Sequence, residues 1–246
     1  MTGQGGPFPL VELLLWDTEF WGVRAARIRA ATTLELSQGL VECAERGVRW
    51  ASLLVPVADP HLVGAAVRAG FEVVDIRVTM STTLHEGVEP SEACLVAPDE
   101  LDQALLLVQD AFRTSRFYLD THLDRVRCSE FYRTWVRNSF SGKMADAIVA
   151  SRHGGTLDAF VTVRREVDRT ASLPLVAVRS DRRGVGVGAR VVSDALNWLR
   201  SHGSSKATVV TQLANIAAIR LYESVGFSIS ESGVWLHHWL DPDGSS

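Results

Sequence analysis

Residues 175–189 read Leu-Val-Ala-Val-Arg-Ser-Asp-Arg-Arg-Gly-Val-Gly-Val-Gly-Ala, and this stretch decides the fold. The apolar run from Leu175 to Val178 predicts a strand, and apolar residues at helical spacing after Gly188 predict a helix. A glycine-rich turn between a strand and a helix lets backbone N–H groups converge on an anion, and the helix dipole adds its positive end. The segment therefore predicts a loop that cradles a pyrophosphate.

The same glycines also satisfy the dinucleotide pattern G-x-G-x-x-G/A, from Gly184 to Ala189. That pattern requires an acidic residue roughly 20 positions further on, which holds a ribose. No Asp or Glu lies between Gly203 and Tyr222, and only 58 residues follow Gly188, too few for a long continuation of strands and helices. The sequence therefore disfavours a dinucleotide site.

A second motif follows at a distance that makes the first more specific. Asn215 opens a predicted helix that ends in Leu221-Tyr-x-x-x-Gly-Phe227. With the R/Q-x-x-G-x-G/A pattern met by residues 183–188, the sequence resembles the GNAT family of N-acetyltransferases over about its last 140 residues. The resemblance implies an α/β (α+β) GNAT fold with a mixed central sheet, and an acyl-coenzyme A-dependent N-acetyltransferase.

The resemblance also implies a donor site for acetyl-CoA. No metal is expected, because the seven histidines show no metal-ligand spacing. It places coenzyme A against a strand edge, the glycine loop and the Asn that opens the next helix. The cofactor-binding candidates are Val176, Ala177, Val178, Arg183, Gly184, Val185, Gly186, Val187, Gly188, Ala189 and Asn215. For Asn215 a plain helix N-cap is an equally simple interpretation, and it does not exclude contact with the pantetheine arm.

Two catalytic roles follow from the same resemblance. Tyr222 stands where the family has the general acid that serves the leaving thiol, although a packing role alone is the alternative. A base must accept the proton of the incoming ammonium, directly or through water. Asp75 is the first candidate and Glu166 the second, and an ordinary surface carboxylate is the alternative for each.

A closer resemblance extends over nearly the whole chain, to the dTDP-fucosamine acetyltransferases. It is carried by residues 16–22, Trp-Asp-Thr-Glu-Phe-Trp-Gly, by residues 115–117, Ser-Arg-Phe, and by Phe131 and Tyr132. It implies the amine of a nucleotide-linked 4-amino-4,6-dideoxyhexose as acceptor. Arg116 would hold a phosphate, while Phe117 and Tyr132 would contact the substrate. The alternatives are a surface arginine and core aromatics.

Two other functions stay open at this point. One is a GNAT acetyltransferase that acts on a small amine, an antibiotic or a peptide N-terminus. The other is a non-catalytic acyl-CoA-binding module, which the presence of Tyr222 beside an intact glycine loop disfavours.

The chain also resembles itself. Residues 47–84 align with residues 203–240 without a gap, at a constant offset of 156. In both copies an apolar run leads to a helix-starting residue, Asp59 or Asn215, and a glycine ends the helix. Each copy therefore predicts a strand, a short helix and a second strand, although chance similarity between two such units is the alternative.

The two copies differ where the chemistry is expected. No glycine loop precedes the first copy, and Ala66 occupies the position of Tyr222. We therefore expect residues 1–90 to form a smaller, degenerate GNAT-like supporting domain and residues 91–246 to form the GNAT domain. In the latter, helices are expected at 99–112, 130–139, 189–202 and 216–225, and strands at 145–150, 157–164, 175–178, 207–211 and 234–239.

Composition excludes several classes of protein. With 25 basic and 29 acidic residues the net charge is −4, and the arginines are scattered among acids, so neither nucleic acid nor a membrane is expected as a partner. Three cysteines without C-x-x-C spacing argue against a disulfide framework or a thiolate metal site. The start of the chain lacks signal-peptide character, and no apolar segment approaches the ~20 residues that span a bilayer. We expect a cytoplasmic protein with a small-molecule substrate, and a homodimer is left open.

Overall fold

The structure is a computed structural model, and it describes residues 9–85, 94–109 and 111–240. Its contacts divide the chain into two compact units. Unit 1 comprises Met1–Arg77 and Ser232–Ser246, and unit 2 comprises Val78–Glu231. Within the described part of the chain, no helix is long and apolar enough to cross a membrane.

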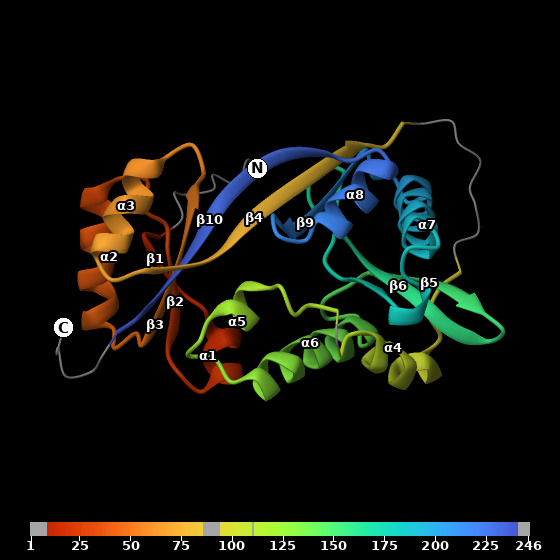
Figure 1. Cartoon of the computed structure of the whole chain (residues 1–246), viewed down its shortest axis with the longest axis horizontal. Helices are drawn as coiled ribbons and strands as arrows, with labels where there is room; N and C mark the ends of the chain where they lie inside the picture. Colours follow the sequence, from red (N-terminus) through yellow and green to blue (C-terminus); the bar gives the residue numbers. More distant parts are fainter. Residues whose placement is uncertain (1–8, 86–93, 110, 241–246) are drawn as a thin grey trace, which may run out of the picture. The chain divides into compact units, whose positions relative to one another are not determined.

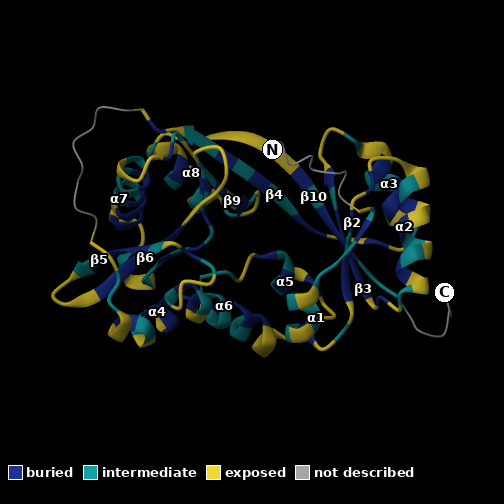
Figure 2. Cartoon of the chain, turned by 180° about the vertical axis from the view of Figure 1, so that it is seen from behind, coloured by how far each residue is buried: buried dark blue, intermediate teal, exposed yellow. Residues whose placement is uncertain are grey.

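Unit 1 has helices α2 and α3 packed on a mixed sheet (Figure 1). Its elements are β1 (Val11–Leu13), α1 (Leu15–Trp21), β2 (Ala25–Ile28), α2 (Thr33–Glu45), β3 (Trp50–Pro56), α3 (Pro60–Arg68), the start of β4 (Glu72–Thr83) and the end of β10 (Ser228–Trp239). β1, β2, β3 and β10 follow one another in the strand order; β2 and β3 pair in parallel, and the β1–β2 and β3–β10 pairs are antiparallel. Figure 2 shows buried strands beneath α2 and α3, whose outer faces are exposed.

Unit 2 has helices on both faces of a mixed sheet, with α7 on one face and α4 and α6 on the other (Figure 1). Its elements are the end of β4, η1 (Pro98–Glu100), α4 (Leu101–Leu107), α5 (Arg116–Leu119), α6 (Arg125–Phe140), β5 (Ala147–His153), β6 (Thr156–Arg165), β7 (Thr170–Leu173), β8 (Val176–Val178), η2 (Ser180–Arg182), α7 (Val187–Ser201), β9 (Lys206–Gln212), α8 (Ile216–Ser224) and the start of β10. The strand order is β4-β9-β7-β6-β5, with β8 paired to β6. The expected mixed α/β fold is confirmed.

Two sequence patterns explain the core of unit 2. Every residue of β6 from Leu157 to Val163 is buried, as expected for a strand covered on both faces. On α7 the buried residues Val191, Val192, Ala195 and Leu199 recur at helical spacing and form one apolar stripe. The stripe packs with β6 and β9 in a single hydrophobic cluster, which fixes α7 on the sheet.

The internal repeat is visible in the element bounds. Adding 156 to the bounds of β3, α3 and β4 gives 206–212, 216–224 and 228–239, which are the bounds of β9, α8 and β10. The helix starts also match, because Asp59 accepts a hydrogen bond from the N–H of Leu62 and Asn215 accepts one from the N–H of Ala218. Descent of the first copy from a complete GNAT domain stays a prediction.

The units do not divide the chain at residue 90. The second half of β10 pairs with β3, from Gly233 opposite Pro56 to Trp239 opposite Trp50, and so belongs to unit 1. The second half of β4 is next to β9 in the strand order and belongs to unit 2. The last strand of each copy thus ends in the sheet of the other copy. The division of roles between residues 1–90 and 91–246 remains a prediction.

Candidate active site

The sheet of unit 2 opens where β7 gives way to β8. β7 pairs in parallel with β9, from Thr170 opposite Lys206 to Leu173 opposite Val209. Pro174 follows and has no N–H to give to a ladder. Beyond it β8 pairs with β6, and among the described residues no strand pairs with the other edge of β8. A strand edge is therefore left open beside β9.

The register with β6 determines which backbone groups face the open edge. The N–H of Thr162 donates to the carbonyl of Leu175 at 2.9 Å, and the N–H of Arg179 donates to the carbonyl of Asp158 at 2.8 Å. Hydrogen-bonded pairs alternate in an antiparallel ladder, so Ala177 directs its N–H and C=O toward β6. Val176 and Val178 therefore direct theirs to the open edge, which favours them over Ala177 as ligand-binding groups.

The glycine loop follows directly. Gly184 and Gly186 have φ values of 77° and 85°, a region that residues with a side chain rarely adopt. A Cβ built at either position would have no atom within 4 Å, so glycine is required there by the backbone and not by crowding. Gly188 differs, because a Cβ there would collide with Cδ1 of Leu221. Glycine at 188 lets α7 approach α8.

The loop ends in an uncapped helix. Gly186 is the N-cap of α7, and no side chain caps it. The first N–H groups of an α-helix have no partner inside the helix. Those of Val187, Gly188 and Ala189 are therefore available to an anion, and the helix dipole adds to the attraction.

Arg183 stands at the entrance to the loop. Its Nε donates to the carbonyl of Val178 at 3.2 Å, so it reaches back over the open edge of β8. Within the described part of the chain no carboxylate lies within ion-pair distance of its guanidinium, whereas Arg179 and Arg182 are both paired. Arg183 thus offers a free positive charge beside the glycine loop.

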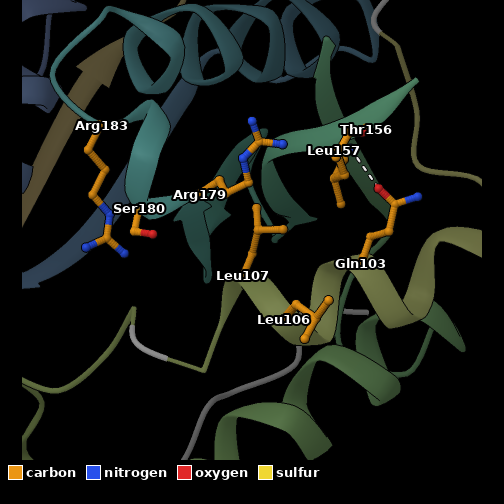
Figure 3. Close-up of a pocket in the computed structure, with 8 residues that line it drawn as sticks. All are labelled: Gln103, Leu106, Leu107, Thr156, Leu157, Arg179, Ser180 and Arg183. Carbon is orange, nitrogen blue, oxygen red and sulfur yellow. Dashed lines mark hydrogen bonds between the residues drawn. The ribbon is translucent and has the colours of Figure 1, made fainter. Parts of the chain in front are cut away.

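A small hollow of about 150 Å³ adjoins this arginine (Figure 3). Leu106, Leu107 and Gln103 come from α4, and Arg179, Ser180 and Arg183 come from the turn after β8. Gln103 accepts a hydrogen bond from the backbone N–H of Leu157 at 2.8 Å, which fixes α4 to the start of β6. One wall of the hollow is therefore apolar and the other is cationic.

Helix α8 presents two of the expected residues on one face. Asn215 is its N-cap and uses a side-chain oxygen to accept from the N–H of Ala218 at 3.2 Å. Its amide nitrogen makes no bond to the described residues, so capping and ligand contact are compatible. Tyr222 lies seven residues later, two turns along the same face, and is 6% exposed. Burial raises the pKa of Tyr222, so its hydroxyl is protonated at neutral pH.

The open strand edge, the glycine loop and the start of α7 lie within the part of the chain that matches a known family. Residues 113–227 match the model of the acetyltransferase (GNAT) family. This part of the chain is a domain of the acetyltransferase (GNAT) family. Enzymes of this family use acetyl-CoA as acyl donor.

Relatives with names cover different shares of the chain. The dTDP-fucosamine acetyltransferase of Escherichia coli O6:H1 is 24% identical over 230 residues, which are 92% of this chain and 97% of that protein. The spore coat polysaccharide biosynthesis protein SpsD of Bacillus subtilis is 30% identical over 142 residues, which are 58% of this chain. The chain therefore spans about half of SpsD, 48%, and nearly all of the E. coli enzyme.

A solved structure of the same fold supports the assignment of the fold alone. It is a GCN5-related N-acetyltransferase from Sphaerobacter thermophilus, with a TM-score of 0.63 and 12% identity. The match covers 93% of this chain and 76% of that one. Unit 1 is thus included in a shared architecture and is not an addition peculiar to this chain.

The expected acceptor residues of the GNAT domain lie in an aromatic cluster. Phe117 packs on Phe131 with ring centroids 4.4 Å apart, and Tyr132 stacks on Phe112 at 4.3 Å. Phe117 and Tyr132 are each 6% exposed, which favours a packing role. The guanidinium of Arg116 lies 4.4 Å from the centre of the Phe117 ring. Contact between these three candidates and a substrate stays a prediction.

The candidate bases differ in burial. Asp75 lies on β4 in unit 1 and is 9% exposed. The other catalytic candidate, Tyr222, belongs to unit 2. Glu166 follows β6, is exposed and accepts a hydrogen bond from the hydroxyl of Ser172 at 3.0 Å. The burial of Asp75 distinguishes it from an ordinary surface carboxylate, and its catalytic role remains a prediction.

Sequence reasoning missed Asp158. This aspartate lies on β6 and is 1% exposed. Its backbone carbonyl accepts a hydrogen bond from the N–H of Arg179, which places it next to the segment that leads into the glycine loop. The available signal was a single acidic residue inside the otherwise apolar run 157–161. In the described ranges, no group of three or more His, Cys, Asp and Glu is arranged to hold a metal ion.

Proposed function

We propose that this GNAT enzyme transfers the acetyl group of acetyl-CoA to the amine of a nucleotide-linked amino sugar, of the dTDP-4-amino-4,6-dideoxyhexose type. The observation that carries the donor half is the open edge of β8 beside the uncapped start of α7. An extended amide chain can pair with an open strand edge, and a pyrophosphate fits a helix N-terminus. The strand edge and the helix start are adjacent, just as the amide-containing pantetheine arm and the pyrophosphate are adjacent in coenzyme A.

Residues of the chain can be given roles on this basis. The outward backbone groups of Val176 and Val178 would bind the pantetheine arm, with the amide of Asn215 as a further donor. The N–H groups of residues 187–189 and the guanidinium of Arg183 would bind the phosphates. The hydrogen bond that Nε of Arg183 donates to the carbonyl of Val178, at 3.2 Å, must then break so that this carbonyl can bind the pantetheine arm. The bound donor supplies a thioester carbonyl that an amine can attack.

Tyr222 would donate a hydrogen bond to the departing sulfur. An unperturbed Tyr has a pKa of about 10 and a thiol about 8.5, so complete proton transfer to a finished thiolate is uphill by roughly 2 kcal/mol. Burial raises the pKa of Tyr222 further and makes complete transfer still less favourable. Its contribution is therefore a hydrogen bond that strengthens while the carbon–sulfur bond breaks.

The acceptor half is supported by the relatives. The E. coli relative that aligns over 92% of this chain is named for acetylation of dTDP-fucosamine, and SpsD is named for polysaccharide biosynthesis. Arg116 would hold a phosphate of the nucleotide, since a guanidinium offers two parallel donors to phosphate oxygens. Asp75 would accept the proton of the ammonium, with Glu166 as the second candidate.

A comparison of acceptors tests this proposal. Thiol release from acetyl-CoA would be followed with a dTDP-4-amino-4,6-dideoxyhexose, with the same amino sugar free of nucleotide, and with simple amines and N-terminal peptides. We expect kcat/KM for the dTDP form to exceed that for the free sugar by at least about 100-fold, because roughly 3 kcal/mol is a modest gain for a bound diphosphate and base. Equal efficiency for the two would reject the nucleotide-sugar acceptor.

The base can be assigned with the same substrate. Asp75→Asn removes a proton acceptor and should lower kcat by about 100-fold or more if Asp75 is the base. Glu166→Gln is the matched variant at the exposed site and should change kcat by less than about twofold. The reverse pattern would transfer the role to Glu166.

A further inference from the structure

The buried carboxylate of Asp158 lies in a site that none of the roles above uses. Its side chain is 2% exposed, and each of its two oxygens has one arginine partner. Oδ1 lies 3.0 Å from Nη1 of Arg179, and Oδ2 accepts from Nε of Arg182 at 3.1 Å. Oδ2 is thus hydrogen-bonded, whereas Oδ1 has the ion pair with Arg179 but no hydrogen-bond partner among the described residues. A buried charge is costly unless it is paired, so the carboxylate favours keeping both arginines against it.

The arginines are positioned on the segment that leads into the glycine loop. Arg179 directly precedes the single turn η2 and Arg182 is its last residue, and the N–H of Arg182 donates to the carbonyl of Arg179 at 2.9 Å. Arg179 is fixed a second time through its own N–H, which donates to the carbonyl of Asp158, and a third time through Asp181, at 2.6 Å. The direction in which the chain enters Arg183 and Gly184 is therefore set from β6.

The same contacts show which of the three arginines have their charge balanced by a carboxylate. Asp158 pairs with both Arg179 and Arg182, and Asp181 pairs with Arg179, so the two carboxylates together balance the charge of the two arginines. Arg183 has no carboxylate partner among the residues that the structure describes, and in Figure 3 it lies apart from Arg179 at the same hollow. One free guanidinium is thus left beside the amides of α7.

We infer that Asp158 is a positioning residue for the phosphate-binding loop, which acts through Arg179 and Arg182 on the placement of Arg183 and the glycine amides. The inference rests on the proposed binding of coenzyme A at this loop. It makes a selective prediction, because only ligands that carry the phosphates use the loop. A donor that ends at pantetheine uses the edge of β8 alone.

The experiment compares two donors in one variant. Asp158→Asn keeps the size of the side chain and removes its charge. We expect the calorimetric Kd for coenzyme A to rise about 10-fold, equivalent to about 1.4 kcal/mol. Turnover of acetyl-pantetheine, which has no phosphate, should keep the kcat/KM of the parent within about twofold. Parent-like affinity for coenzyme A, or an equal loss with both donors, would overturn the inference.

Control variants keep the test decisive. Asp146 directly precedes β5, accepts from the N–H of Arg165 at the far end of β6 and has a side chain that is 39% exposed, so Asp146→Asn removes an exposed carboxylate of unit 2 without touching the loop. If Asp158→Asn does not fold, Arg182→Gln removes one contact and leaves Arg179 on Asp158, and should raise the same Kd about threefold. Arg182→Lys should restore most of that loss, and a Kd equal to that of the parent for Arg182→Gln would contradict the inference.

One further variant separates this inference from the proposed function. Gly186→Val disturbs the loop itself. If it binds coenzyme A as the parent does, the ligand is held elsewhere and the proposed function loses its donor site. If Gly186→Val weakens binding and Asp158→Asn does not, only the role of Asp158 is wrong.

Discussion

Gly186→Val perturbs the phosphate loop through its backbone alone. Gly186 has φ 85° and ψ −4°, and a Cβ there would meet no atom within 4 Å, so no packing is lost or strained. The left-handed conformation costs a residue with a side chain roughly 1–2 kcal/mol, and a β-branched residue is among the least tolerant. The loop should escape this strain by changing conformation, so affinity for coenzyme A should fall by about 5- to 30-fold. Strain that remains in the loop should in addition lower the Tm, by up to about 2–8 °C.

Calorimetry with coenzyme A and a thermal melt of the same protein measure both quantities. Gly142→Val is the matched control, because Gly142 has φ 75° and equally open surroundings but follows α6. It should lower the Tm by a similar amount and leave the Kd unchanged. Gly186→Asn should bind nearly as the parent does, since Asn tolerates this conformation. The reasoning is refuted if Gly186→Val binds coenzyme A as the parent does, or if Gly186→Asn is as impaired as Gly186→Val.

Three further outcomes are expected. Tyr222→Phe should lower kcat by about 10²–10⁴-fold in single-turnover measurements and leave the Kd for coenzyme A unchanged. Retention of more than half of the parent rate would contradict a catalytic role for Tyr222. Burial raises the pKa of Cys43 and Cys128 to about 11, whereas Cys94 is exposed, so one thiol of three should react with a disulfide reagent at pH 8 in the native protein. Burial also raises the pKa of Tyr222 and of Tyr132. In denaturant titrations the free energy of unfolding should therefore be independent of these groups below about pH 10 and fall above it, by up to about 1.4 kcal/mol per tyrosine and pH unit. The appearance of three phenolates at pH 11 without unfolding would contradict this.

Local patterns in the sequence predicted most elements of unit 2. The strand expected at 157–164 is β6 at Thr156–Arg165, and the strand expected at 145–150 is β5 at Ala147–His153. The helix expected at 99–112 is shorter: α4 covers Leu101–Leu107 after the single turn η1. The short elements β7 and α5 were not predicted, because four residues give too little periodicity to recognise.

The sequence by itself determined the glycine loop, the helix behind it and the repeat at an offset of 156, because positive φ, apolar spacing and helix caps are properties of neighbouring residues. Only the tertiary structure decided that Val176 and Val178 face the open edge, since that depends on the register between β8 and β6. It also decided that the end of β10 completes the sheet of unit 1. The tertiary structure also decided that Asp158 pairs with Arg179 and Arg182, which lie 21 and 24 positions further along the chain. Strand register and buried ion pairs join residues that are distant in the chain, and no local pattern encodes which of them will meet.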